Sequence, residues 1–127
     1  MKIICPTLER EEPATLQNIE EIVPLLENKE NPYVILEEDD LTYMQTLWTP
    51  DGYDLEYQEG NILEHYWLTE LASQEDIIWA LQTYLKGEPY WKTKFKFEKK
   101  DIATPSFKIG YQVGRFFGKL SNFFTGK

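Results

Sequence analysis

The fold is decided by the stretch PDGYDLEYQ at residues 50–58, where a turn signal leads into a strongly alternating strand. Proline presets the first turn position and glycine accepts a positive φ angle, so residues 49–52 predict a tight turn. The strand that follows alternates apolar and polar side chains, which indicates two unlike faces. Tyr53, Leu55 and Tyr57 are expected on one face of a sheet, and Asp54, Glu56 and Gln58 on the other.

Outward from this strand, residues 32–68 read as a meander of four strands. The other three are expected at residues 33–37, 41–48 and 62–68, which are rich in β-branched and aromatic side chains. Polar turns at residues 38–40 and 59–61 separate them. The short lengths of these turns predict antiparallel pairing between neighbouring strands.

The residues before the meander predict a helix. Asn18 followed by Glu21 has the spacing of a capping box, so a helix is expected from Ile19 to about Glu27. Pro24 interrupts it, which predicts a short or kinked helix. Residues 15–17 are expected as a short strand and residues 6–13 as a polar loop.

A second helix and a last strand follow the meander. Ser73 is a good N-cap, and Ile77, Ala80 and Leu81 begin a stripe with helical spacing. Gly87 and a following proline mark the end of this helix. Residues 90–96 alternate aromatic or polar side chains with lysines and are expected as a strand. Those lysines protect an exposed sheet edge or pair with acidic neighbours.

Together these elements predict an α+β fold. We expect a mainly antiparallel, five- to six-stranded meander sheet with two helices packed on one face, in a single domain over residues 1–103. Residues 104–127 are expected as a basic, aromatic C-terminal helix or tail, in which glycines recur at every fourth position.

Charge is distributed unevenly along the chain. Residues 1–91 hold 20 acidic and four basic side chains, whereas residues 92–127 hold two acidic and nine basic ones. An acidic body repels the phosphate backbone of nucleic acids and favours a basic protein partner. The single cysteine excludes an intramolecular disulfide, and no apolar run approaches the length of a bilayer span, so a cytoplasmic protein is expected.

The sequence offers little for catalysis. His65 is the only histidine and has no metal-ligand spacing around it, so it is interpreted as a strand residue. Cys5 would need a neighbouring base to act as a nucleophile, and no cysteine-enzyme motif surrounds it. No phosphate-binding glycine loop is present. We therefore expect a protein that is not an enzyme and that has no cofactor and no metal.

Partner binding is expected through acidic and aromatic side chains on the uncovered face of the sheet. The run at residues 37–40 is interpreted either as a solvated turn or as one edge of a docking surface for a basic protein. The candidate partner-binding residues are Glu37, Glu38, Asp39, Asp40, Asp54, Glu56, Glu64 and Tyr66.

The tail has its own candidate residues for association. They are Gly110, Gly114 and Gly118, which permit close helix packing, and Lys108, Arg115 and Lys119. Three readings stay open: the tail docks on its own acidic body or on a second copy, it lies on a membrane surface, or it is mobile. The alternative function is therefore a membrane-peripheral or self-associating adaptor.

The order of elements resembles that of the small bacterial immunity proteins of the Imm1 type. The resemblance covers roughly residues 14–98: a strand and helix at residues 15–27, central hairpins, and the helix SQEDIIWALQTYLKGEP (73–89) before an aromatic strand. It implies a bacterial toxin inhibitor without catalysis of its own, and the acidic body independently favours a basic toxin domain as the partner.

Overall fold

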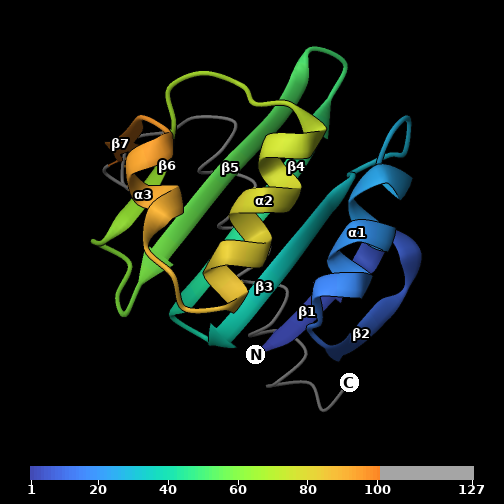
Figure 1. Ribbon diagram of the computed structural model, residues 1–127, viewed down its shortest axis with the longest axis horizontal. Helices are drawn as coiled ribbons and strands as arrows, with labels where there is room; N and C mark the ends of the chain where they lie inside the picture. Colours follow the sequence, from blue (N-terminus) through green and yellow to red (C-terminus); the bar gives the residue numbers. More distant parts are fainter. Residues whose placement is uncertain (101–127) are drawn as a thin grey trace.

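Within residues 1–100, seven antiparallel strands form one sheet, and the strand that follows the turn at residues 49–52 lies inside it (Figure 1). The structure is a computed structural model that describes residues 1–100. The strands are β1 (Lys2–Cys5), β2 (Arg10–Pro13), β3 (Tyr33–Asp39), β4 (Thr42–Thr49), β5 (Gly52–Glu59), β6 (His65–Leu68) and β7 (Phe97–Lys99). Their order is β2-β1-β3-β4-β5-β6-β7. The predicted α+β class with an antiparallel sheet is confirmed, although the sheet has seven strands instead of five or six.

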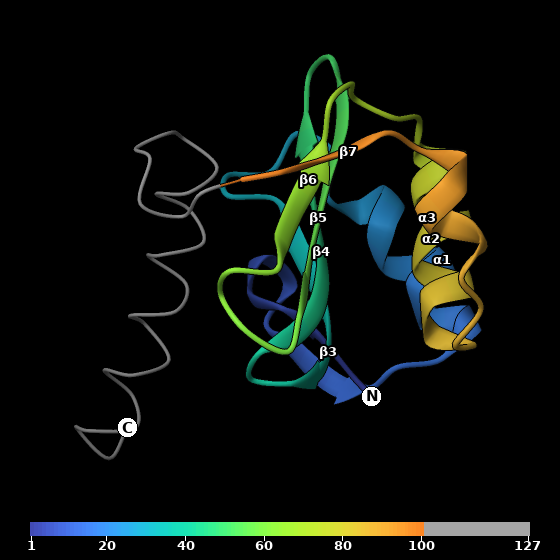
Figure 2. The same ribbon diagram turned by 90° about the vertical axis from the view of Figure 1, so that its left-hand side faces the viewer.

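In the described part of the chain, three α-helices cover one face of the sheet (Figure 2). They are α1 (Leu16–Leu25), α2 (Gln74–Leu85) and α3 (Tyr90–Lys94), one more than the sequence predicted for this part of the chain. The core fills the space between the two layers, because each sheet face and helix stripe must bury its apolar side chains against another element. Val34, Leu36, Met44, Leu55 and Ile77 are among its fully buried members.

The meander matches the prediction because its alternation is strong. Thr46 pairs with Leu55, and Glu56 pairs with Gln45 on one side and with Trp67 on the other. This register turns Leu55 and Tyr57 toward the helices and Glu56 away from them. The expected strand at residues 62–68 forms only from His65 onward.

The N-terminal hairpin was missed by the sequence analysis, which expected a polar loop at residues 6–13. β1 inserts between β2 and β3, and the one-turn 3-10 helix η1 (Pro6–Leu8) joins β1 to β2. Ile3 and Cys5 of β1 enter the core. β2 has the sequence REEP, whose polar residues give no strand signal, so pairing with β1 decides its conformation.

Helix α1 begins earlier than predicted. Thr15, not Asn18, is the N-cap: its hydroxyl accepts a hydrogen bond from the Asn18 backbone N–H (3.0 Å), and the Asn18 side chain accepts one from the Thr15 N–H (2.8 Å). This reciprocal pair is a capping box, so the predicted strand at residues 15–17 is wrong. Pro24 lies in the last turn of the helix, which ends one residue later at Leu25, as expected for a helix that a proline shortens.

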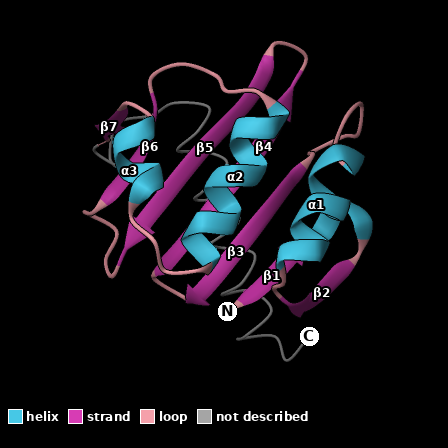
Figure 3. Cartoon of the chain, viewed as in Figure 1, coloured by secondary structure: helices cyan, strands magenta, loops and turns pink. Residues whose placement is uncertain are grey.

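The C-terminal part of the described chain contains one confirmed and one wrong prediction. Ser73 caps α2 as expected, by accepting a hydrogen bond from the Asp76 N–H (3.1 Å). The predicted strand at residues 90–96 is instead the short helix α3, followed by β7 (Figure 3). Trp91 on α3 is buried edge-on against the ring of Tyr57, and this packing favours a helical turn over an extended one. The predicted helix within residues 104–127 lies outside the described residues.

Candidate binding surface at the acidic end of the sheet

The end of β3 positions three exposed carboxylates. Glu37 pairs with Tyr43 and Asp39 pairs with Thr42, so Glu38 is the extra residue of a β-bulge. A bulge bends the strand and re-aims the side chain at that position. In the turn that follows, the Asp39 carboxylate accepts a hydrogen bond from the Leu41 N–H (2.9 Å). Glu38, Asp39 and Asp40 are exposed at a strand end and turn, as the sequence predicted.

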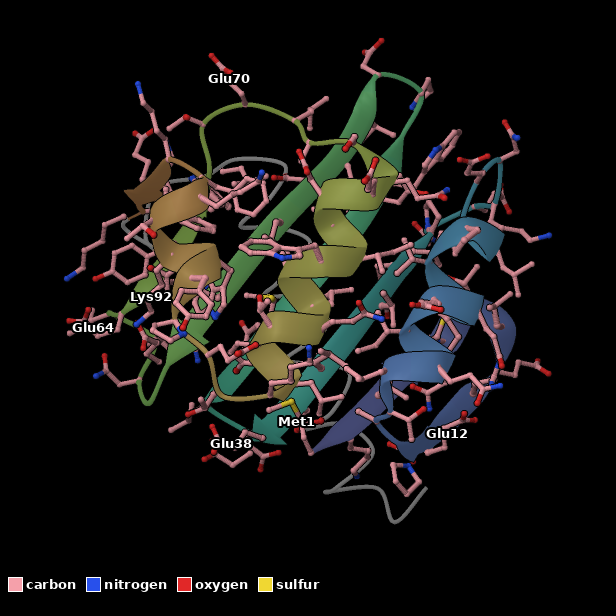
Figure 4. All side chains as sticks on the ribbon, viewed as in Figure 1. Met1, Glu12, Glu38, Glu64, Glu70 and Lys92 are labelled. Atoms are coloured by element: carbon pink, nitrogen blue, oxygen red, sulfur yellow. The ribbon has the colours of Figure 1, made fainter. Side chains whose placement is uncertain are left out.

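These residues line an open groove of about 820 Å³, called here the acidic groove. Figure 4 shows Met1 and Glu38 close together at this end of the sheet, with Glu12 further along the same edge. The lining residues are Met1, Lys2, Glu11, Glu12, Pro13, Glu37, Glu38, Asp39 and Asp40. Six carboxylates therefore face one lysine, so the groove has a strongly negative potential.

Part of this charge is paired. Lys2 approaches Glu11 (3.6 Å between Nζ and Oε1), and Arg10 forms a closer pair with Glu12 (2.7 Å between Nη2 and Oε1). Among the described residues, no cation forms an ion pair with Glu38 or Asp39. The uncompensated charge of the groove is therefore concentrated at these two residues, beside the bulge.

The pKa values of two side chains follow from this arrangement. The hydrogen bond from Arg10, followed by one from Asn18, holds the pKa of Glu12 below its ordinary range. Burial raises the pKa of Tyr84, and the negative charges of Glu38, Glu59 and Asp39 raise it further. The negative charges at this end of the sheet thus reach Tyr84 on α2 and disfavour ionisation of its hydroxyl group.

A second hollow of about 360 Å³ adjoins the acidic groove and shares Met1 and Glu38 with it. Its walls include exposed Pro89, half-buried Tyr84 and buried Trp91, so a small apolar surface lies beside the carboxylates. Interfaces are anchored by buried aromatic groups and surrounded by polar ones. Acidic and aromatic side chains therefore occur together at the end of the sheet, whereas the sequence analysis expected them on its uncovered face.

The structure corrects the predicted location of the other acidic candidates. Asp54 and Glu56 are only 4% and 2% exposed, and Glu37 is also buried, so the expectation of an exposed carboxylate face is wrong for these three. Alternation placed Asp54 and Glu56 on the face away from the helices correctly, but that face is not open to solvent. The Glu56 carboxylate contacts His65 (3.2 Å between Oε2 and Nε2).

Glu64 and Tyr66 lie elsewhere. Figure 4 places Glu64 on the opposite side of the molecule from Glu12. The Tyr66 hydroxyl donates a hydrogen bond to Glu64 (2.6 Å), which raises the pKa of the tyrosine and lowers the pKa of the carboxyl group. The Tyr66 ring stacks on Tyr57, on the helix-covered side. These two residues do not join the acidic groove.

The two side chains considered for catalysis are far apart in the fold. Cys5 belongs to the core under the helices, where burial raises the pKa of its thiol. His65 lies on the other face of the sheet, four strand positions away from β1. Within residues 1–100, no group of three or more His, Cys, Asp or Glu side chains is arranged to hold a metal ion.

Glu11, Glu12 and Met1 are groove residues that sequence reasoning did not identify. Glu11 and Glu12 belong to β2 and Met1 precedes β1, and only the pairing of β2 with β1 and of β1 with β3 brings them beside Glu38. The sole sequence signal was the acidic character of residues 9–12, which is equally typical of a loop. The tail residues Lys108, Gly110, Gly114, Arg115, Gly118 and Lys119 lie outside the described residues.

Comparison of the chain with protein-family models, curated proteins and solved structures found no match. The resemblance to Imm1-type immunity proteins therefore stays a prediction. Over residues 1–100, no helix has both the length and the apolar character that crossing a membrane requires.

Proposed function

We propose that this protein is a non-enzymatic, acidic binding domain that engages a basic protein partner through the acidic groove. The observation that carries the proposal is the concentration of six carboxylates against one lysine in an open groove. Clustered carboxylates steer a basic protein during encounter and select it over acidic ones. We further propose that binding inhibits the partner, as an immunity protein inhibits a toxin.

The neighbouring apolar surface supports protein binding more than it supports capture of small cations. Met1 is 43% exposed, and Trp91 and Pro89 line the hollow that adjoins it. A basic partner that places an apolar or aromatic side chain there would bury contact area while its cations meet Glu38 and Asp39. Such a combination of anchor and charged rim is common in specific interfaces.

The proposal is tested with a variant that keeps the shape of the groove. Glu38→Gln, Asp39→Asn and Asp40→Asn together remove three charges, and the amide introduced at position 39 retains an oxygen that can accept the Leu41 N–H. Full-length wild type and this variant are used to capture proteins from cells of the source organism, with elution by a salt gradient and identification by mass spectrometry. The affinity of the captured basic protein is then measured by titration.

A matched control removes three exposed charges that do not line the groove: Glu20→Gln, Glu70→Gln and Glu75→Gln. We expect the groove variant to bind at least about tenfold more weakly, roughly 1.4 kcal/mol, and to show a smaller salt dependence, with the control near wild type. Equal weakening by both triple variants would show that total charge, and not the groove, attracts the partner. A captured partner whose own activity is unchanged by saturating protein would leave binding intact and refute inhibition.

A further inference from the structure

The sheet face opposite the helices is buried although its centre is polar. All three α-helices of the described residues lie on the other face (Figure 2). On this face without helices, Gln45 and His65 are each 1% exposed. The buried side chains of the face are Ile35, Glu37, Tyr43, Gln45, Leu47, Asp54, Glu56, Gln58, His65 and Trp67. A sheet face can exclude water to this extent only when a second layer covers it.

The polar groups show what kind of layer this must be. The Glu56–His65 pair is nearly fully buried, with side chains 3% and 1% exposed. Gln45 lies beside Glu56 on the neighbouring strand, and its side-chain amide makes no hydrogen bond within the described part of the chain. An amide that has lost water without gaining a partner indicates an apolar contact above it. The covering layer is therefore rich in apolar side chains.

The chain leaves the described region beside this face. The Lys100 N–H donates a hydrogen bond to the His65 carbonyl (3.1 Å), and the Lys100 ammonium lies 5.4 Å from the centre of the Trp67 ring. Residues 101–127 follow directly and contain six aromatic side chains and four cations against one carboxylate. The aromatic residues are Phe107, Tyr111, Phe116, Phe117, Phe123 and Phe124.

We propose that residues 101–127 cover this face of their own chain, with aromatic side chains over Ile35, Gln45 and Trp67 and with cations near Asp54 and Glu37. The distance is easily covered, because β6 and β3 are three strand spacings apart, about 14 Å, whereas even a helix of 27 residues is about 40 Å long. The charges are complementary, since the face holds three carboxylates and the segment is basic. The inference is independent of the acidic groove.

The chain provides one chemical probe on each face of the sheet. His65 is the only histidine and lies on the polar face, and Cys5 is the only cysteine and lies in the core under the helices. Acylation of His65 by diethyl pyrocarbonate, located by mass spectrometry, reports removal of the cover. Reaction of Cys5 with a disulfide reagent reports general unfolding. The two rates are measured in the same full-length sample.

The decisive variant is Phe116→Ser, Phe117→Ser, Phe123→Ser and Phe124→Ser in the full chain, with Ser106→Ala and Ser121→Ala as the control. If the tail is the cover, we expect His65 to react at least about tenfold faster in the variant while Cys5 stays protected, because only one face has opened. The control is expected to match wild type. Unchanged protection of His65 in the variant would overturn the proposal.

Two further measurements test whether another molecule covers the face and whether the phenylalanine variant is still folded. In the wild type, protection of His65 that weakens on dilution would show that a second copy is the cover and would overturn docking within one chain. If the phenylalanine variant also exposes Cys5, the milder variant Lys108→Gln, Arg115→Gln and Lys119→Gln decides by the same two rates. If only the reaction of His65 is faster than in wild type, the result supports the tail as the cover. If the reactions of His65 and Cys5 are accelerated equally, or not at all, the result overturns the proposal.

Discussion

Carboxylates on the face of the sheet and carboxylates at its end have opposite environments. Glu56, in the middle of β5, is buried and contacts His65. Glu38, at the bulge of β3, is exposed, and no described cation pairs with it. Both belong to antiparallel strands of the same meander. Alternation along a strand thus tells which face a side chain occupies, whereas the presence of a layer over that face decides whether water reaches it.

The comparison also separates structural from interaction roles. A buried carboxylate must keep its partners, because an unpaired one has lost its hydration without compensation. An exposed cluster of carboxylates slightly destabilises the fold through mutual repulsion, and it is retained where it serves solubility or binding. The following substitutions test this distinction, beginning with the largest expected effect.

Leu55→Ala measures how much burial on the helix-covered face contributes to the free energy of unfolding. Leu55 is fully buried under the helices, whereas the adjacent residues Asp54 and Glu56 point to the opposite face of the sheet. Truncation of Leu55 therefore leaves a cavity in the core. We expect the free energy of unfolding to fall by about 2–5 kcal/mol, measured by urea denaturation. Leu71→Ala, at a residue that is 45% exposed, is the control and should change it by less than about 0.5 kcal/mol. Equal losses would show that β5 is not packed under the helices.

Glu56→Ala tests the polar face on the same strand. The substitution leaves the buried His65 imidazole without its carboxylate, so we expect a loss of about 1–3 kcal/mol in the same denaturation experiment. Glu98→Ala on β7, where the side chain is largely exposed, is the matched control. Glu56→Gln should lose less than Glu56→Ala because the amide retains a hydrogen-bonding atom. A loss no larger than that of the control would place Glu56 in water.

Glu38→Gln tests the end of the sheet. Removal of one charge from a crowded acidic groove relieves repulsion, so the free energy of unfolding should rise slightly, by at most about 0.5 kcal/mol. The gain should shrink as salt is added, because exposed charges are screened. A clear destabilisation, independent of salt, would mean that Glu38 supports the fold as Glu56 does.

Glu12→Gln is expected to have the smallest effect, a slight loss of stability near neutral pH that disappears in acid. The folded-state pKa of Glu12 lies below its ordinary value of 4.5, chiefly through the hydrogen bond from Arg10. This carboxylate therefore contributes stability above pH 4.5 that is lost as pH falls through the folded-state pKa.

The measurement is the urea midpoint of unfolding, determined at a series of pH values from neutral to acid. In the Glu12→Gln variant the loss of stability on acidification should be shallower than in wild type. Arg10→Met should produce the same flattening, because it removes the main cause of the shift. A full acid dependence in both variants would show that other carboxyl groups account for it.

The sequence predicted the meander because its signals are local and mutually consistent. The turn at residues 49–52, the alternation of β5 and the cap at Ser73 each depend on residues close in the chain. The exposed position of Glu38 and Asp39 was likewise readable from a polar run between two strands. The exposure assigned to Asp54 and Glu56 was wrong because period-two alternation distinguishes two faces without saying whether each is covered.

The amino-acid sequence by itself determined the α+β class, the four central strands, α2 and the acidic character of the body, since propensity, turn chemistry and charge are local properties. Only the tertiary structure decided that the REEP segment is a strand, that residues 90–94 are helical and that Glu56 is buried. Pairing with β1 brings Glu11 and Glu12 beside Glu38, and packing against Tyr57 fixes Trp91 on α3. These outcomes depend on contacts between residues distant in the chain, for which a local pattern contains no signal.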